Sequence, residues 1–286
     1  SRAGLICKRW HQALIPTSEN MVRKQYVMVK RVANVDRCAK AALKEADIDK
    51  IDEQLRFVLS PSVCKSKWIT AVKEIFSTVA RDAPRKDVRV LTSLPDERDF
   101  AEMELDISEG EEPDGPPDAE NSQMPMGYPV VAVGGTFDHM HAGHRLLLTV
   151  SAMLARDMLI VGVSSDELLK NKQYAEFIEP YEDRVRKVRD FIFSVNSNLR
   201  VQVAKLTEPA GPAATNSAID AIVVTTETEK GAHQINKNRR EAGMPEMKII
   251  TVDLVFPAGM EAKISSTQFR AEEARMKPRS REPVFA

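Results

Sequence analysis

The sequence lacks long apolar runs and carries almost no net charge. No stretch of about 18 apolar residues occurs, so the sequence predicts no membrane-spanning helix. Lysine and arginine number 41, and aspartate and glutamate 42, which leaves a formal net charge of −1 at pH 7. A chain this close to neutrality has no overall attraction for polyanions or anionic lipid surfaces. We therefore expect neither nucleic acid nor membrane among its partners.

Cysteine is also scarce. The three cysteines, Cys7, Cys38 and Cys64, are odd in number, lie in the first third of the chain and lack metal-ligand spacing. Such usage is typical of reduced thiols, and the first residues lack the apolar core of a secretory signal. We therefore expect a cytoplasmic protein. No Gly-x-x-x-x-Gly-Lys-Ser/Thr sequence is present, which excludes a P-loop within these residues.

Composition divides the chain into four parts. Residues 96–120 carry twelve acidic residues and one arginine, together with prolines and glycines, and such a segment cannot bury a core. We therefore predict a disordered acidic linker over residues 95–127. The linker separates a smaller, mostly helical N-terminal region of unknown role, residues 1–94, from a larger domain over residues 128–277. A short basic tail, residues 278–286, follows.

The larger domain alternates between short apolar runs and amphipathic stretches. This alternation is typical of an α/β fold with a doubly wound parallel sheet, here of five strands and Rossmann-like. The predicted strands span residues 129–133, 158–163, 199–205, 218–225 and 248–255. The predicted helices span residues 143–156, 180–195, 229–242 and 265–276, with others at 35–46 and after Ser66. Ligands of such sheets bind at the carboxyl ends of strands, so motifs there carry the chemistry.

Two histidines follow the first of these strands. The segment Gly134-Gly-Thr-Phe-Asp-His-Met-His-Ala-Gly-His144 places His141 and His144 on one face of a helix start. Free N–H groups at a helix start favour anions. The pattern therefore indicates a nucleotide phosphate site, although histidines at this spacing also occur as half of a metal site. We expect Asp138 to cap the helix or brace the loop, and His139 to be exposed.

A hydroxyl-rich motif follows the last predicted strand. The segment Ile264-Ser-Ser-Thr-Gln-Phe-Arg270 places three hydroxyl groups at a helix start and an arginine about one turn later. Such a set can cradle the β- and γ-phosphates of a nucleoside triphosphate. Because serine and threonine are also ordinary helix caps, the indication comes from the pairing of this motif with the histidine motif.

Together the two motifs resemble the signatures of the HxGH nucleotidyltransferase superfamily. Within it, the segment with Glu227-Thr228, Gly231-Ala232 and Ile235-Asn236 resembles the eukaryotic and archaeal phosphopantetheine adenylyltransferases. This resemblance implies adenylyl transfer from ATP to 4′-phosphopantetheine, giving dephospho-coenzyme A and pyrophosphate in coenzyme A biosynthesis. It also implies Mg²⁺ that arrives with ATP and is held mainly by the triphosphate.

The same resemblance implies a set of site residues. Transfer between two phosphate groups requires positive, preorganised donors and no nucleophilic side chain. The implied catalytic residues are His141, His144, Lys172 and Arg270, with Lys170 as the alternative lysine. The implied ATP-binding residues are Gly134, Gly135, Phe137, His144, Glu227, Thr228, Gly231, Ser265, Ser266, Thr267 and Arg270. The implied phosphopantetheine-binding residues are Thr136, Lys172, Thr207 and Glu208, and no protein ligand for a metal is implied.

Other functions remain open. One is another transferase of the superfamily, acting on nicotinamide mononucleotide, phosphocholine or glycerol phosphate. Another is a non-catalytic scaffold subunit of a complex that synthesises coenzyme A, and the N-terminal region could dock other enzymes of that pathway. Arg184 resembles a Glu-Arg element of the family, and its alternative is an ordinary surface charge on a helix.

Overall fold

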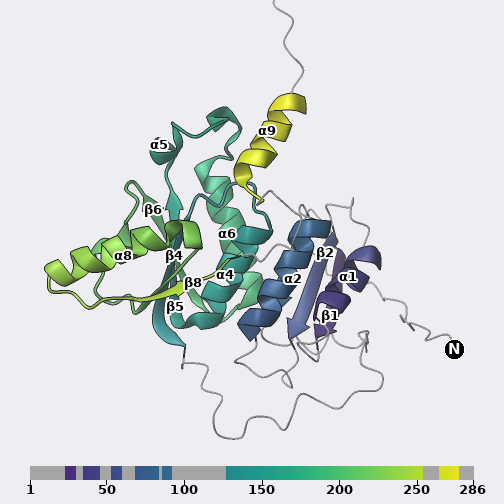
Figure 1. Ribbon diagram of the computed structural model, residues 1–286, viewed down its shortest axis with the longest axis horizontal. Coiled ribbons are helices and arrows are strands. Elements are labelled where there is room, and N and C mark those ends of the chain that lie inside the picture. The colour runs from purple at the N-terminus through teal and green to yellow at the C-terminus, as the bar shows by residue number, and fades with distance from the viewer. Residues whose placement is uncertain are drawn as a thin grey trace, which may run out of the picture.

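The fold is described from a computed structural model (Figure 1). It describes residues 23–29, 35–45, 53–59, 68–83, 86–91, 127–253 and 264–276. The predicted acidic linker lies outside the described residues apart from Gly127, and so does the predicted basic tail. None of the described helices combines the length and the apolar content that crossing a membrane requires.

The larger domain is built on a five-stranded sheet. Its strands are β4 (Tyr128–Gly135), β5 (Ala155–Ser164), β6 (Arg200–Leu206), β7 (Ala221–Val224) and β8 (Lys248–Thr251). They lie in the order β6-β5-β4-β7-β8 and all pair in parallel, as the sequence predicts. After β6 the chain crosses to the other side of β4 and forms β7. The topological switch point therefore lies between β4 and β7, where ligands of such sheets bind.

Helices cover both faces of this sheet. The covering helices are α4 (Ala142–Leu154), α6 (Tyr181–Val195), α7 (Pro212–Thr215) and α8 (Thr226–Glu241). Beyond the carboxyl ends of the strands lie α5 (Asp166–Leu169), a 3₁₀ turn η3 (Ala175–Phe177) and α9 (Ser266–Met276) (Figure 1). Alternate side chains of β4 point to opposite faces, so Val131 and Val133 join the core under α4 and α6, whereas Ala132 joins a second core under α8.

The N-terminal region forms a second, smaller layer. Its elements are β1 (Arg23–Val29), α1 (Val35–Glu45), β2 (Glu53–Leu59), α2 (Trp68–Asp82) and β3 (Asp87–Leu91). The two helices agree with the sequence prediction, but the three strands, which form a parallel sheet in the order β1-β2-β3, were not predicted. We call these five elements the N-terminal layer.

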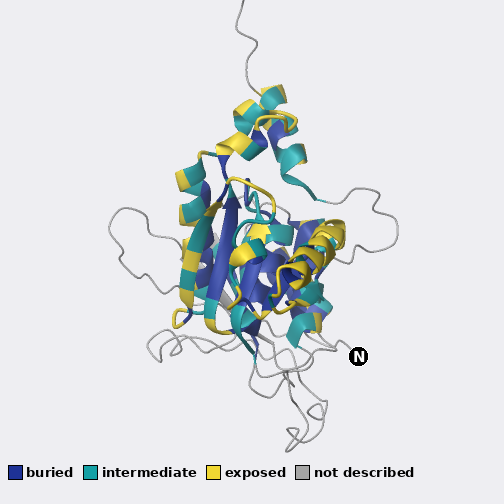
Figure 2. Cartoon of the chain, turned by 90° about the vertical axis from the view of Figure 1, so that its left-hand side faces the viewer, coloured by how far each residue is buried: buried dark blue, intermediate teal, exposed yellow. Residues whose placement is uncertain are grey.

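The N-terminal layer packs against the back of the larger domain. Helix α2 lies on α4, and β3 contacts both α4 and α6 (Figure 1). One continuous apolar cluster includes Phe76 of α2, Val90 of β3 and Leu148 of α4. At the opposite end of the domain α9 stands apart from this core, and Arg270 is its only buried residue (Figure 2).

Arg239 holds the far side of the domain together, and no acidic residue in the described ranges pairs with it. Its fully buried guanidinium donates to the carbonyls of Pro245, Ala213 and Asn216 at 2.7–2.8 Å, and to that of Ile219 at 3.4 Å. One side chain of α8 thus ties α7, the loop before β7 and the loop before β8. Burial lowers the pKa of Arg239 from its ordinary value, because desolvation disfavours the charge.

Replacing Arg239 should destabilise the protein much more than replacing its neighbour Arg240. Arg239→Ala leaves buried carbonyls without a donor, and we expect the free energy of unfolding to fall by about 3 kcal/mol. Arg240 is exposed and pairs only with Glu246, so Arg240→Ala should cost about 0.5 kcal/mol or less. Urea unfolding of both variants measures the difference, and equal losses would contradict the role given to Arg239.

Candidate active site

The loop after β4 turns sharply because two of its residues adopt left-handed backbone conformations. Phe137 has φ 52° and His139 has φ 47°. The Phe137 ring is fully buried, lies 3.1 Å from the position that a Cβ on Gly135 would occupy, and packs 5.5 Å from the His144 ring. The Phe137 side chain thus supports the loop from below, and the ATP contact that the sequence assigns to this residue stays a prediction.

His141 and His144 come together at the start of α4, as the sequence predicts. Their rings stack with centroids 4.0 Å apart and planes 22° from parallel. His141 is the N-cap residue, and its Nδ1 accepts the backbone N–H of Gly143 at 3.2 Å. A neutral His141 that accepts at Nδ1 carries its proton on Nε2. The histidine pair therefore adds a hydrogen-bond donor beside the free N–H groups of the helix start.

The second histidine is held neutral by its surroundings. Burial lowers the pKa of His144 well below its ordinary value of 6.5, and the positive charges of His141, Arg145 and Lys172 lower it further. Its Nδ1 is buried and has no hydrogen-bond partner among the described residues. The ring is thus oriented by stacking on His141 and by contact with Phe137.

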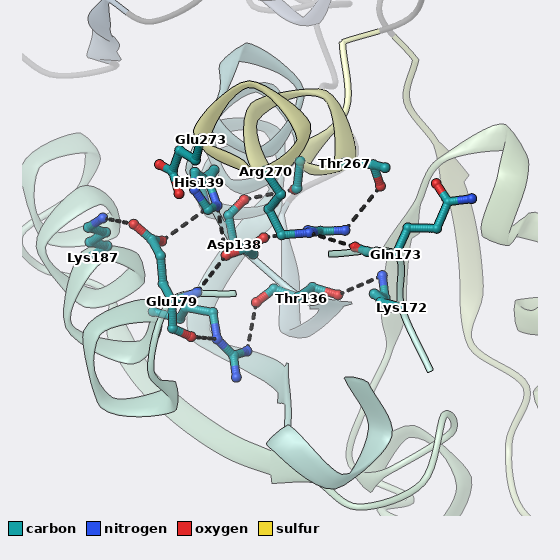
Figure 3. Close-up of polar contacts among 12 residues, drawn as sticks. Thr136, Asp138, His139, Lys172, Gln173, Glu179, Lys187, Thr267, Arg270 and Glu273 are labelled. Atoms are coloured by element: carbon teal, nitrogen blue, oxygen red, sulfur yellow. Dashed lines mark hydrogen bonds and ion pairs between the residues drawn. The ribbon is translucent and has the colours of Figure 1, made fainter. Parts of the chain in front are cut away.

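Asp138 is the centre of a buried polar network (Figure 3). Its carboxylate accepts the backbone N–H of Glu179 at 2.9 Å and the Arg270 guanidinium at 2.5 Å, and lies 2.9 Å from His139 Nδ1. Burial favours the neutral form, but these contacts outweigh it and lower the pKa of Asp138. Asp138 therefore braces the loop, which is one of the two roles that the sequence suggests for it.

The same network attaches α9 to the histidine loop. Arg270 of α9 is 1% exposed and donates to Asp138, to the Gln173 carbonyl at 3.1 Å and to Thr267 Oγ1 at 3.0 Å. The Ser266 hydroxyl donates to the Asp138 carbonyl at 2.8 Å. The two sequence motifs, far apart in the chain, thus meet. Arg270 joins them, and its side chain has only its remaining N–H groups to offer a ligand.

The lysine loop reaches the histidine loop through one residue. Lys172 Nζ donates to Thr136 Oγ1 at 3.2 Å (Figure 3). Burial lowers the pKa of Lys172, and the charges of Arg270 and Arg184 also lower it, although Asp138 opposes them. Lys170 is exposed on the same loop. The contact to Thr136 distinguishes Lys172 from Lys170, which the sequence left as alternatives.

Arg184 is a buried organiser of the sheet edge and not a surface charge. Its guanidinium is fully buried and donates to the carbonyls of Thr136 and Ser164 at 2.9 and 2.8 Å. It also donates to the Glu179 carbonyl at 2.9 Å and to Asp166 at 2.8 Å. Arg184 therefore fixes the ends of β4 and β5 relative to each other.

The helices that follow β4, β7 and β8, namely α4, α8 and α9, differ in how their N-terminal N–H groups are satisfied. At α8 the Asp253 carboxylate accepts the Thr226 N–H at 3.0 Å, so a negative charge already occupies that end. At α4 and α9 the partners are neutral, His141 Nδ1 and Gln268 Oε1. Because helix N-termini favour anions, the starts of α4 and α9 are the places where phosphate groups fit best.

The remaining predicted residues lie on either side of the histidines. Glu227, Thr228 and Gly231 belong to α8, which follows β7. There Thr228 forms a capping box with Thr225, and a Cβ at Gly231 would meet nothing within 4 Å. Thr207 and Glu208 are exposed after the edge strand β6, two strands from β4. No described contact joins either group to the histidine pair.

One cluster has the composition of a metal site. Ligand atoms of Asp138, His139 and Glu179 lie within 4.8 Å of one another. The carboxylate oxygens of Glu179 accept the His139 N–H at 2.9 Å and the Lys187 ammonium, and those of Asp138 are occupied as described above. All four oxygens therefore have donors, and the cluster is an internal ion-pair network.

His139 lies within this network and is not exposed. Its Nδ1 faces Asp138, and its Nε2 lies 3.0 Å from Glu273 Oε1 on α9. The hydrogen bond to Asp138 raises the pKa of His139; burial opposes this, and Glu273 adds to the rise. The imidazole thus lies between carboxylates of the loop and of α9.

The contribution of His139 to stability should depend on pH. A histidine whose pKa is higher in the folded state than in the unfolded state stabilises the folded protein when it is protonated. This stabilisation is complete below the unfolded pKa of about 6.5 and is lost as pH rises through the folded-state pKa. Asparagine tolerates a positive φ, so it suits the backbone at this position. His139→Asn should therefore lower the melting temperature more at pH 6 than at pH 8. Thermal unfolding at both pH values tests this, and a larger loss at pH 8 would contradict it.

Comparison with known proteins finds similar sequences over the larger domain. A family model described as cytidylyltransferase-like matches residues 132–272. The phosphopantetheine adenylyltransferase of Thermococcus gammatolerans is 42% identical over 144 residues, which cover 50% of this chain and 89% of that protein.

Two fungal proteins match over longer stretches. The phosphopantetheine adenylyltransferase of Saccharomyces cerevisiae is 37% identical over 195 residues, covering 62% of each chain. An uncharacterized protein of Schizosaccharomyces pombe is 39% identical over 166 residues, covering 56% of this chain and 52% of its own. This chain thus spans only part of the length of its fungal relatives. The archaeal match spans nearly a whole protein, and the chain therefore belongs to the phosphopantetheine adenylyltransferase family.

Proposed function

We propose that this chain transfers the adenylyl group of ATP to 4′-phosphopantetheine, giving dephospho-coenzyme A and pyrophosphate. The observation that carries the proposal is the meeting of two uncompensated helix starts, those of α4 and α9, around the stacked pair of His141 and His144. Two phosphate-bearing substrates need such a site, because their mutual repulsion is the main barrier to bringing them together.

The reaction requires no nucleophilic side chain. An oxygen of the acceptor phosphate attacks the α-phosphorus of ATP, and the bond from that phosphorus to the oxygen bridging to the β-phosphate breaks. Pyrophosphate leaves with the electron pair of that bond. The attacking phosphate oxygen is already an anion, so no base is needed. The protein contributes positioning and stabilisation of the negative charge that develops.

Each phosphate can be assigned to a group of donors. Thr136 and Lys172, already in contact, would bind the acceptor phosphate, and His141 and His144 would donate to the α-phosphate in the transition state. Ser265, Ser266 and Thr267 at the start of α9 would bind the β- and γ-phosphates, with the remaining N–H groups of Arg270. The support for this is the neutral capping of both helices.

The nucleoside and the pantetheine arm would extend in opposite directions from the histidines. Glu227, Thr228 and Gly231 would lie beside the adenosine, after β7. The glycines Gly134 and Gly135 at the end of β4 leave the backbone open to the nucleotide. Thr207 and Glu208 would lie beside the pantetheine arm, after β6. The placement of β7 and β6 on opposite sides of β4 supports this arrangement.

Magnesium would enter with ATP and screen the triphosphate. The described carboxylate cluster of Asp138 and Glu179 does not fit a metal ion, because its oxygens already accept hydrogen bonds or ion pairs. Mg²⁺ also retains water and substrate phosphates as ligands in many enzymes. The scarcity of cysteine continues to favour the cytoplasm as the place of action.

Pyrophosphate release by the purified chain tests the proposed function. The protein is incubated with Mg²⁺ and ATP plus either 4′-phosphopantetheine or nicotinamide mononucleotide, and with CTP plus phosphocholine. Release with phosphopantetheine alone is the expected result. Release only with another acceptor would assign a different transferase of the superfamily. Silence of the folded protein with every pair would favour a scaffold subunit.

His144→Ala should lower kcat on the order of 10²-fold, because one donor to the transition state is lost. The KM for ATP should change little, since the interaction forms mainly in the transition state. Steady-state kinetics measure both constants, and circular dichroism checks that the variant is folded. An unchanged kcat in the folded variant would remove His144 from the catalytic set.

The two lysines of the loop provide a matched comparison. Lys172→Ala should lower kcat/KM for 4′-phosphopantetheine by about tenfold or more, because a point charge beside the acceptor phosphate is lost. Lys170→Ala, which removes the same charge two residues away, should stay within about twofold. Kinetics with the acceptor varied measure the effect. A larger loss in Lys170→Ala would reverse the assignment.

A further inference from the structure

The buried guanidinium of Arg145 connects α4 to residues of the N-terminal region. Arg145, next to His144 in the first turn of α4, is 8% exposed. Its Nε lies 3.3 Å from Asp87 Oδ1 at the start of β3, and its Nη1 donates to the Lys86 carbonyl at 3.0 Å. A guanidinium removed from water requires such partners, because its desolvation is costly. The N-terminal layer supplies both of these.

Asp87 is shared between two helices of the larger domain. Besides Arg145 it pairs with Arg89, whose Nη2 lies 3.1 Å from its Oδ2. Arg89 in turn donates to the Asp190 carbonyl of α6 at 3.2 Å and lies 5.5 Å from the centre of the Phe191 ring. Burial would raise the pKa of Asp87, but Arg145 and Arg89 outweigh it and lower the pKa. Asp87 is therefore an anion at neutral pH.

The larger domain has relatives without room for this layer. The Thermococcus gammatolerans protein matches over 144 residues that make up 89% of its length, and the remainder is too short to hold β1 to β3 with their helices. The layer is thus an addition to a domain that exists alone elsewhere. It contacts that domain at the turn that carries the two histidines.

We propose that Asp87 and Lys86 are positioning residues, which hold the first turn of α4 through Arg145 and thereby place His141 and His144 for transfer. His141 caps α4, and His144 and Arg145 lie in its first turn. A shift of Arg145 therefore moves both histidine rings. A displacement of about 1 Å at a reacting centre can cost on the order of 10²-fold in rate. The kinetic part of this proposal rests on the proposed function.

The charge of Arg145 also lowers the pKa of His144. Burial is the largest cause of the lowered pKa of His144, and His141, Arg145, Lys172 and His139 add to it in that order. His141 stacks on the ring, whereas Arg145 reaches back to β3. The N-terminal layer thus holds one of the charges that keep His144 neutral.

The test begins with Asp87→Asn in the full chain. The variant leaves Arg145 buried without an anionic partner, so kcat should fall about tenfold, with the KM for ATP within about twofold. The matched control is Val90→Ala, which removes packing from the same strand without touching Arg145. It should lower stability while leaving kcat of the folded protein unchanged. An unchanged kcat in Asp87→Asn would overturn the proposal.

A double-mutant cycle separates positioning from general damage. In an Arg145→Met background, Asp87→Asn should change kcat by less than about twofold, because Asp87 acts through Arg145. The same tenfold loss in both backgrounds would overturn the proposal. If Asp87→Asn does not fold, Arg145→Lys replaces it, since lysine keeps the charge but loses the fork of donors. A full rate in Arg145→Lys would likewise contradict the positioning role.

Hydrogen exchange tests positioning without any substrate. Backbone amides of Arg145–Val150 bond to carbonyls of the first turns of α4, and their exchange should accelerate in Asp87→Asn but not in Val90→Ala of similar stability. If the wild-type chain releases no pyrophosphate with 4′-phosphopantetheine, the proposed function fails. Hydrogen exchange alone then decides whether Asp87 positions the first turn of α4. Unchanged exchange in Asp87→Asn would then refute the positioning role.

Discussion

Asp138 and Arg270 form a buried ion pair between residues 132 positions apart, and the candidate site depends on it. Neither charge could remain inside the protein alone, because a buried charge without a partner is strongly destabilising. Together they hold the start of α9 against the loop after β4. This pair, together with the hydrogen bond from Ser266 to the Asp138 carbonyl and the contact between His139 and Glu273, holds the hydroxyl-rich motif beside the histidine motif.

The electrostatic character of the site follows from what surrounds that pair. The carboxylates near the loop, those of Asp138 and Glu179, accept hydrogen bonds from groups within the protein, so they do not repel an incoming phosphate. Asp253 accepts from the start of α8, whereas the described capping partners at the starts of α4 and α9 are neutral. The proposed site for two anionic substrates would therefore depend on the distribution of negative charge as much as on the placement of cations.

The sequence predicted the sheet and both phosphate motifs because each rests on a local signal. Apolar runs mark β4 to β7, and α4 and α9 begin within one residue of their predicted starts. Strands of the N-terminal layer carry charged residues within them, as in Arg23–Val29, and their pairing partners are distant in sequence, so no local pattern identified them.

The buried arginines could not be recognised from sequence for a related reason. Arg184 and Arg239 occur in helices rich in charge, and Arg145 lies in the first turn of a mostly apolar helix; an arginine is usually exposed. Their partners are mainly backbone carbonyls that the fold brings together from other elements. A sequence does not reveal which backbone carbonyls will accept from an arginine, because every residue has a carbonyl. The burial of Phe137 could not be recognised either, since it depends on the left-handed turn of its loop.

The long separation between Asp138 and Arg270 also orders events during synthesis on the ribosome. Domains form progressively as the chain emerges at roughly 5–20 residues per second, so the histidine loop, α4 and β5 are made well before α9. Until Arg270 emerges, the Asp138 carboxylate lacks its buried counter-charge, and the loop cannot settle into its final form. The sheet can therefore assemble early, but the phosphate site is completed late, when the nascent chain has delivered its last described helix.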